Sequence, residues 1–296
     1  LTVIQGEALT ARGVRQWTQE GKVEARRGSI VDRNGETLAL STTAYIVSVN
    51  PRKVTDDAAF AARMAGLLDV EQQTILNKLK NKNNAFVVLK RQVPRATVDA
   101  IRTLRAQDES AAKLLQGLSF SEDTRRVYIK GQFLAQALGL TNVDSEGQSG
   151  LEQQYDAVLK GEDGILLTEV DRKARTMPQS NTTYIAPQTG NTVQLTIDAS
   201  IQSFVERAMR ECIQVNNAKS VTSIVMDVNT GAILALCMKP DYDPNSPPRD
   251  DIKTLTELMR ISAVSDAYEP GSTFKSLTCA AALDAGVASV GDTFQC

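Results

Sequence analysis

The sequence contains no histidine. Without an imidazole, every Ser-His-Asp and Cys-His mechanism is excluded, and so are most zinc sites, because histidine supplies the base or a ligand in each of them. A nucleophilic enzyme with this sequence would therefore need another base, and lysine is the obvious candidate. We expect no metal ion and no cofactor.

The sequence also lacks long apolar runs and any excess of one charge. No run approaches the roughly 18 apolar residues that a membrane-spanning helix requires. The 33 Lys and Arg residues nearly balance the 35 Asp and Glu residues, for a net charge of −2. This balance gives no reason to expect nucleic acid as a partner. At 296 residues, the chain can form about two domains with separate cores.

Cysteine is scarce, and no two of the four residues form a C-x-x-C motif. Cys212 and Cys279 fall on apolar positions of predicted helices, and Cys237 ends an apolar strand. We therefore expect buried free thiols, with disulfides as the alternative. A partner for Cys296, the last residue, could lie outside the sequence.

The most informative stretch reads Tyr268-Glu269-Pro270-Gly271-Ser272-Thr273-Phe274-Lys275. Its Pro-Gly pair favours a turn. Apolar residues then recur at helical spacing over 274–282, until Gly286 ends the predicted helix. Ser272 therefore stands at the start of this helix, and Lys275 lies one turn further along the same face.

This arrangement suits a serine nucleophile with a lysine base. The positive end of the helix dipole favours an alkoxide forming on Ser272, and Lys275 is near enough to accept its proton. Phe274, Leu277 and Ala281 are expected to surround the amine with apolar groups, and desolvation lowers the pKa of a lysine. Ser272 and Lys275 are the candidate catalytic residues.

The Ser-x-x-Lys spacing occurs a second time, at Ser110 and Lys113. No Pro-Gly turn precedes this copy, and Asp108 and Glu109 stand directly before it. We interpret it as a solvated helix face without a catalytic role.

The first part of the chain mixes strands and helices, which predicts an α+β fold. The dipeptide Asn34-Gly35 between two apolar runs indicates a hairpin. Further strands are expected at 44–49, 86–89, 118–120, 125–128 and 165–170, and helices at 58–68, 71–80, 94–104, 131–138 and 151–159. Residues 176–192 are rich in Thr, Asn, Gln and Pro and form the candidate linker, so we place one domain at 1–190 and a second at 191–296.

The second domain is expected to begin with a strand at 193–197. Asp198 can cap a helix over 199–215, with an apolar stripe at Ile201, Phe204, Val205, Ala208, Met209 and Cys212. Two apolar strands at 221–228 and 232–237 predict a central hairpin that is covered on both faces.

Five segments together resemble the class B, monofunctional penicillin-binding proteins, the D,D-transpeptidases that cross-link peptidoglycan. Residues 268–275 are similar to the active-site box of this family, and 225–235 to the strands that precede it. Residues 27–35, 126–128 and 150–156 are similar to motifs of its non-catalytic pedestal. One departure is Ile129, where the family often has proline.

The resemblance implies roles for the two domains. Residues 1–190 would be a dimerisation-type pedestal that holds cell-wall synthesis or division proteins. Residues 191–296 would be an incomplete penicillin-binding/β-lactamase-like transpeptidase domain. Ser272 would be acylated by peptidoglycan stem peptides or β-lactam antibiotics, with Lys275 as its partner. The resemblance also implies a membrane anchor upstream of this sequence and a location on the extracytoplasmic face of the bacterial cell membrane.

Two further motifs of the family, Ser-x-Asn and Lys-Thr-Gly or Lys-Ser-Gly, are absent downstream of Ser272. We therefore expect these 296 residues alone to be inactive, and the hairpin and the Ser272 helix to lack part of their covering sheet. A non-catalytic scaffold and a β-lactam sensor or serine β-lactamase remain the alternative functions. Four charged residues of the pedestal are expected to form buried ion pairs and turns: Arg27, Asp32, Arg126 and Glu152.

Overall fold

The computed structural model describes residues 18–169 and 183–293. Its contacts divide the chain into two units, Leu1–Ile261 and Ser262–Cys296. In the part of the chain that is described, no helix has the length and apolar character needed to cross a bilayer.

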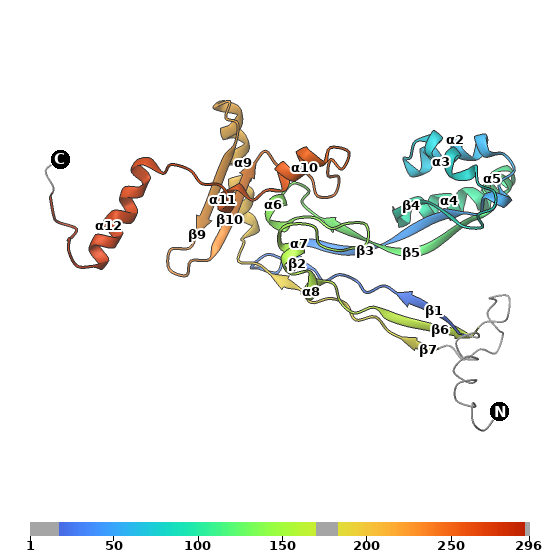
Figure 1. Ribbon diagram of the computed structural model, residues 1–296, viewed down its shortest axis with the longest axis horizontal. Helices are drawn as coiled ribbons and strands as arrows, with labels where there is room; N and C mark the ends of the chain where they lie inside the picture. The colour runs from blue at the N-terminus through green and yellow to red at the C-terminus, as the bar shows by residue number, and fades with distance from the viewer. Residues whose placement is uncertain (1–17, 170–182, 294–296) are drawn as a thin grey trace, which may run out of the picture. The chain divides into compact units, whose positions relative to one another are not determined.

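The first unit is built on a mixed sheet around one long strand (Figure 1). Strand β3 (Thr37–Val49) pairs with antiparallel β5 (Leu118–Tyr128) from Ala39↔Tyr128 to Val49↔Leu118. Its other edge pairs with β4 (Val87–Pro94) and with β2 (Ile30–Val31). Strand β8 (Val193–Gln194) then adds to β2 in parallel. The turn from β2 to β3 contains Asn34 and Gly35, so the predicted hairpin is confirmed.

Strands β3 and β5 are longer than the sequence predicts. The gap expected between 118–120 and 125–128 is bridged, because its polar residues pair with β3 in unbroken register. Within this gap, the carboxylate of Asp123 accepts hydrogen bonds from the side chain of Arg91 and from the backbone N–H groups of Gln92 and Thr124. These bonds satisfy a buried charge in the middle of a strand, where no apolar periodicity would indicate one.

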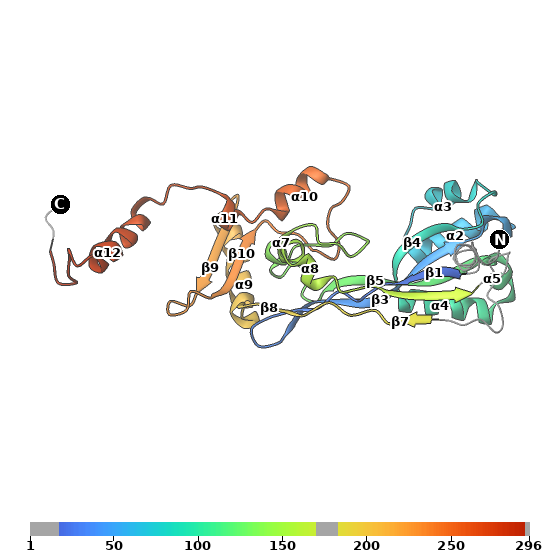
Figure 2. The same ribbon diagram turned by 60° about the horizontal axis from the view of Figure 1, so that its bottom comes forward.

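A group of helices packs against the sheet near the end of β3 and the start of β5 (Figure 2). After the 3₁₀ turn η1 (Pro51–Lys53), these are α2 (Asp57–Leu68), α3 (Gln72–Leu79), α4 (Arg95–Gln107) and α5 (Glu109–Leu114). The side chain of Asp56 caps α2 by accepting from the N–H of Ala59 at 2.9 Å. A fully buried cluster joins the helices to the sheet and includes Val47, Phe60, Met64, Ile75 and Ile101.

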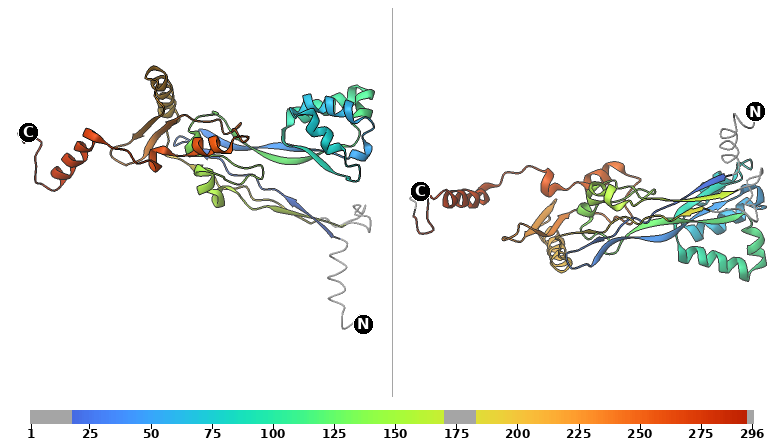
Figure 3. Two further views of the ribbon diagram at one scale, coloured as in Figure 1. Left: turned by 45° about the horizontal axis from the view of Figure 1, so that its top comes forward. Right: turned by 90° about the horizontal axis from the view of Figure 1, so that it is seen from below.

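A second, antiparallel sheet consists of β1 (Thr18–Val23), β6 (Gly164–Glu169) and β7 (Thr183–Ile185). In both views of Figure 3, the blue strand β1 runs alongside the yellow-green strand β6. Strand β7 belongs to the candidate linker 176–192, of which residues 176–182 lie outside the described residues. The domain division at residue 190 stays a prediction.

Three short helices connect the sheets: α6 (Ala135–Leu138), α7 (Gly150–Gln154) and α8 (Asp156–Leu159). The helix predicted at 131–138 is wrong in its first half, because Leu134 adopts a left-handed conformation with φ of 55°. The helix predicted at 151–159 is interrupted at Tyr155, which has φ −105° and ψ 23°.

Replacing Gly139, which ends α6, by alanine is expected to destabilise the protein by about 2 kcal/mol or more. Its φ is 80°, where an L-residue is strained, and a Cβ would lie 1.9 Å from the carbonyl oxygen of Ser149. Gly66→Ala is the control, because Gly66 lies in α2 with open space around it. This substitution should stabilise by about 0.5–1 kcal/mol. Urea unfolding of the two variants measures these changes in stability, and equal changes for Gly139→Ala and Gly66→Ala would contradict the prediction.

The rest of the first unit begins with α9 (Ala199–Val215), capped by Asp198 as predicted. It packs against the antiparallel hairpin of β9 (Val221–Met226) and β10 (Ile233–Lys239). The predicted apolar stripe of α9 is wrong in part, because Phe204 is exposed while Gln202 and Glu206 are buried.

The β9–β10 hairpin is not covered on both faces, so that prediction is wrong, whereas the expectation that the hairpin lacks part of its covering sheet agrees with the structure. Burial alternates along β9, and Ile224 and Met226 are 44% and 52% exposed. Helix α9 packs against this hairpin, and the exposed side chains show that the opposite face of β9 is open. The loop after β10 leads to α10 (Ile252–Met259), whose Leu255 packs with Tyr242 and Leu140. The second unit holds α11 (Ser262–Ser265), η2 (Gly271–Thr273) and α12 (Phe274–Asp284).

Candidate functional site

Ser272 lies in the 3₁₀ turn that leads directly into α12. Gly271 opens this turn with φ of 55°, and the N–H of Thr273 donates to the carbonyl of Pro270 at 3.2 Å. The N–H of Phe274 then donates back to Gly271, which continues the turn into the helix. Lys275 is the second residue of α12. The structure thus positions both candidate residues at the helix start that the sequence predicts.

The end of α12 also matches the prediction. Gly286 adopts φ of 67°, and its N–H donates to Leu283 at 3.1 Å. The N–H of Val287 donates to Ala282 at 3.1 Å. This pair of bonds is a Schellman motif, in which glycine supplies the left-handed residue that stops the helix.

The surroundings predicted for Lys275 are not present in this unit. Phe274 and Leu277 are 55% and 62% exposed, so they do not form the apolar surroundings that the sequence predicts. Neither the Ser272 hydroxyl nor the Lys275 ammonium has a hydrogen-bond or ion-pair partner among residues 18–169 and 183–293. The only other helical elements described in this unit are α11 and η2, which are too short to cover α12.

The cysteine predictions are confirmed in part. Cys212, Cys237 and Cys279 are free thiols, and Cys237 is buried as predicted. Cys212 is half-buried, and Cys279 on α12 is exposed, so the prediction of burial is wrong for Cys279. The reason is again that α12 has no covering layer in its unit. Cys296 lies outside the described residues.

The charged residues of the pedestal form the buried ion pairs that the sequence predicts. The carboxylate of Glu152, which is 0% exposed, accepts from the Nε atoms of Arg27 at 2.6 Å and Arg126 at 2.7 Å. Arg27 also pairs with Asp156 at 2.6 Å, a partner that the sequence did not indicate. Burial raises the pKa of Asp156, but hydrogen bonds from the N–H of Gly147 and from Arg27 outweigh this and lower that pKa. The network joins the start of β2 to β5, α7 and α8.

Asp32 forms the predicted structural turn. Its carboxylate accepts from the N–H groups of Asn34 and Glu36 at 2.8 Å each, and from that of Ala199 at 3.1 Å. Burial raises the pKa of Asp32, but these backbone hydrogen bonds outweigh it and lower that pKa. The ionised carboxylate therefore ties the β2–β3 turn to the start of α9.

Sequence reasoning missed a buried charged cluster between α9 and β10. The carboxylate of Glu206 accepts from Lys239 at 2.7 Å, from Gln202 at 3.0 Å and from the N–H of Leu134 at 3.1 Å. Lys239 also pairs with Asp241. Burial lowers the pKa of Lys239, but its hydrogen bonds to Asp241 and Glu206 outweigh burial and raise that pKa. Burial raises the pKa of Glu206, but hydrogen bonds from Lys239 and the N–H of Leu134 outweigh burial and lower that pKa. The available signal was the i, i+4 pair of Gln202 and Glu206.

Replacing Lys239 by methionine is expected to cost about 2–3 kcal/mol at pH 7, because Glu206 would keep its buried charge without a cation. The depressed pKa of Glu206 contributes stability above its ordinary value of 4.5, and this contribution is lost as the pH falls through the folded value. The difference in free energy of unfolding between the wild type and Lys239→Met should therefore become smaller below about pH 4.5. Urea midpoints at pH 7 and pH 4 measure this, and a pH-independent difference would contradict the role of Glu206.

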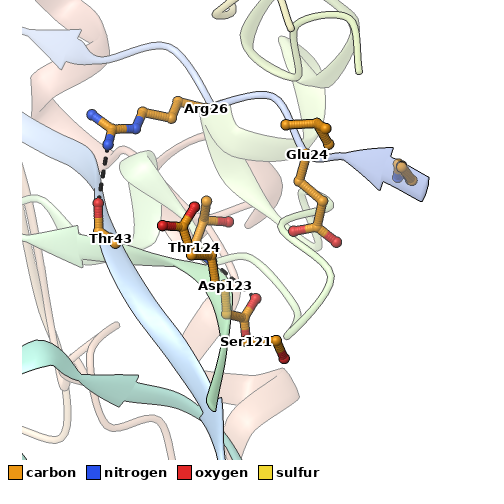
Figure 4. Close-up of a pocket in the computed structure, with 9 residues that line it drawn as sticks. Glu24, Arg26, Thr43, Ser121, Asp123 and Thr124 are labelled. Atoms are coloured by element: carbon orange, nitrogen blue, oxygen red, sulfur yellow. Dashed lines mark hydrogen bonds between the residues drawn. The ribbon is translucent and has the colours of Figure 1, made fainter. Parts of the chain in front are cut away.

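A pocket of about 380 Å³ lies among β1, β3 and β5 (Figure 4). Ser121 and Lys22 both line it, but the ammonium of Lys22 is held by Asp163 at 2.8 Å. That hydrogen bond raises the pKa of Lys22, so this lysine is a poor base. The guanidinium of Arg26 donates to Thr43 at 3.0 Å. The pocket therefore has mixed charge and no serine–lysine pair prepared for catalysis.

Comparison with known proteins identifies the two parts of the chain. The family model described as "Penicillin-binding Protein dimerisation domain" matches residues 22–195. The model described as "Penicillin binding protein transpeptidase domain" matches residues 221–296, which include the Ser272 turn. The first match covers more than half of the chain, and the chain therefore belongs to the class B penicillin-binding proteins.

Relatives align over nearly the whole chain. The probable peptidoglycan D,D-transpeptidase PenA of Neisseria gonorrhoeae is 33% identical, covering 94% of this chain and 46% of the relative. The peptidoglycan D,D-transpeptidase FtsI of Escherichia coli (strain K12) is 31% identical, covering 97% and 47%. Stage V sporulation protein D of Bacillus subtilis (strain 168) is 31% identical, covering 95% and 42%. The chain thus spans about half the length of the curated relatives it matches.

Solved structures have the same fold. A peptidoglycan synthetase from Bifidobacterium adolescentis aligns with a TM-score of 0.59 and 25% identity, over 94% of this chain and 53% of that one. Penicillin Binding Protein 2X from Streptococcus thermophilus aligns with a TM-score of 0.58 and 23% identity, over 93% and 43%. The mixed helix-and-sheet architecture is therefore that of penicillin-binding proteins.

Proposed function

We propose that the full-length protein is a serine-type D,D-transpeptidase that cross-links peptidoglycan stem peptides through an acyl-enzyme on Ser272. The observation that carries this proposal is the position of Ser272 in a glycine-opened turn at the start of α12, within the match to the transpeptidase domain. Relatives named peptidoglycan D,D-transpeptidase, which align over 94% and 97% of the chain, support it.

In the proposed reaction, the hydroxyl of Ser272 attacks the carbonyl of a D-Ala-D-Ala peptide and transfers its proton to Lys275. The N–H of Ser272 serves as one oxyanion donor, and the dipole of α12 favours the developing negative charge. D-Ala leaves, and the amine of a neighbouring stem peptide attacks the acyl-enzyme. A β-lactam acylates the same hydroxyl and is released slowly. No step requires a metal ion or a cofactor.

Exposure of α12 sets a condition on this mechanism. A lysine accepts a proton at neutral pH only when desolvation or nearby charge lowers its pKa. Because the apolar residues beside Lys275 are exposed in their unit, other parts of the full-length protein must pack over α12 before the pair can act.

We further propose that the dimerisation-type pedestal holds proteins of the cell-wall synthesis or division machinery, and that the protein works on the extracytoplasmic face of the bacterial membrane, tethered by an anchor. The match of residues 22–195 to a dimerisation domain supports a non-catalytic role for this part. The buried charged residues of this part are engaged in structural ion pairs, which fits a role in holding rather than in chemistry.

Labelling of the full-length protein with a fluorescent penicillin tests the proposed function. A label that persists on the folded protein, together with cross-linked product from stem peptides, is the expected result. Loss of the label within minutes would instead favour a serine β-lactamase. A folded protein that takes no label would favour the non-catalytic scaffold and refute the acyl-enzyme proposal.

A further inference from the structure

A second pocket, of about 330 Å³, lies between α9 and the loop that follows β5. Lys130 and Gln132 line it from the loop, and Arg207 and Arg210 line it from α9. The two arginines are three residues apart and therefore project from the same side of the helix. This concentration of cations in one hollow differs from the nearly balanced charge of the whole sequence.

The charges around this pocket do not cancel. Lys130 is paired with Glu36 at 2.6 Å, and Glu206 at the pocket wall is paired with Lys239 at 2.7 Å. Among the residues that the structure describes, the side chain of Arg210 has no hydrogen bond or ion pair, and that of Arg207 contacts only the ring of Phe204, at 5.4 Å. Lys239 is shared by Glu206 and Asp241, so that cluster carries one net negative charge. Neither carboxylate bonds the two arginines, whose guanidinium groups have no anionic partner among the described residues.

Two unpaired guanidinium groups beside a pocket favour an anionic ligand with several oxygen atoms. Their planar forks match the oxygen geometry of phosphate and carboxylate. A carboxylate would neutralise only one of the two arginines, whereas a phosphate group carries a charge of about −1.5 to −2 at pH 7. We propose that this pocket binds a dianion of the phosphate class, held by Arg207 and Arg210.

Calorimetric titration of the 296-residue chain with inorganic pyrophosphate and phosphate, at low ionic strength, tests the proposal. We expect saturable binding that weakens with added salt. The double variant Arg207→Gln/Arg210→Gln should lose about tenfold or more in affinity, because charge-assisted hydrogen bonds are lost. The control Arg63→Gln/Arg105→Gln removes the same charge from α2 and α4 and should bind as wild type does.

Parallel measurements identify the source of the phosphate. Vesicles of phosphatidic acid in phosphatidylcholine present it as a lipid headgroup, and pyrophosphate presents it as a soluble ligand. Binding to either one that the Arg207 and Arg210 substitutions weaken by about tenfold or more supports the site. The proposal is overturned if neither probe binds, if the control variant loses as much affinity, or if the dicarboxylate glutarate binds as tightly as pyrophosphate. Circular dichroism confirms that each variant is folded.

Discussion

Replacing Ser272 by alanine is expected to abolish covalent labelling of the full-length protein by a β-lactam. The acyl-enzyme bond forms on the Ser272 hydroxyl in the proposed mechanism, and alanine has no hydroxyl to acylate. Rates of acylation measured by stopped-flow mixing and gel fluorescence would show the loss. Transpeptidation should disappear with the label, because both reactions share the same first step.

Two serines of this chain provide matched controls. Ser276 lies one turn further along α12, and its hydroxyl donates to the carbonyl of Thr273 at 2.7 Å, so Ser276→Ala should label normally. Ser110 belongs to the other Ser-x-x-Lys pair, whose Lys113 bonds the exposed Glu109 at 3.0 Å. Ser110→Ala should also label normally. Label that survives in Ser272→Ala, or that is lost in either control, would refute the assignment of Ser272.

The role of Lys275 requires a separate measurement. If this lysine accepts the serine proton, Lys275→Met should slow acylation by about 10²–10⁴-fold while leaving noncovalent β-lactam binding nearly intact. A lysine that only orients the substrate would instead weaken binding. The two cases differ in whether the maximal acylation rate or the half-saturating concentration changes.

The local features of the segment around Ser272 were predictable from the sequence, but its environment was not. The Pro-Gly pair and Gly286 act through backbone conformation, and the structure shows the left-handed residues Gly271 and Gly286 that such turns require. Burial of Phe274 and Leu277 depends on which other elements pack against α12. Apolar spacing along one helix contains no information about that second partner.

The buried charged residues also show how far the sequence alone predicts contacts. Arg27, Asp32, Arg126 and Glu152 were expected to form buried ion pairs and turns, and Glu152 does pair with both Arg27 and Arg126. Glu206 and Lys239 were overlooked because periodicity identifies apolar faces. A charged residue such as Glu206 only interrupts the apolar pattern of its helix. Its partner Lys239 lies 33 residues away, so the pattern cannot indicate the pair.

Glu152→Gln is expected to destabilise the pedestal by about 3–5 kcal/mol, because it removes the anion shared by two buried guanidinium groups. Arg27 would retain Asp156, but the only ion pair that the structure describes for Arg126 is the one with Glu152. Arg126 would keep its hydrogen bond to the carbonyl of Gly28 at 2.7 Å, but no anion would offset the desolvation of its charge. Urea unfolding of the 296-residue chain at pH 7, followed by far-UV circular dichroism, measures the loss as a lower midpoint at unchanged slope.

Burial, rather than the removal of a charge as such, should set the size of this effect. Glu109→Gln breaks the ion pair with Lys113. The side chain of Glu109 is 85% exposed and that of Lys113 is 77% exposed, so the substitution should lower the free energy of unfolding by less than about 1 kcal/mol. Arg126→Met combined with Glu152→Gln should cost less than the sum of the single changes, because the double variant no longer buries the unpaired Arg126 charge. Additive losses, or equal losses at Glu152 and Glu109, would mean that the buried network does not hold the pedestal together.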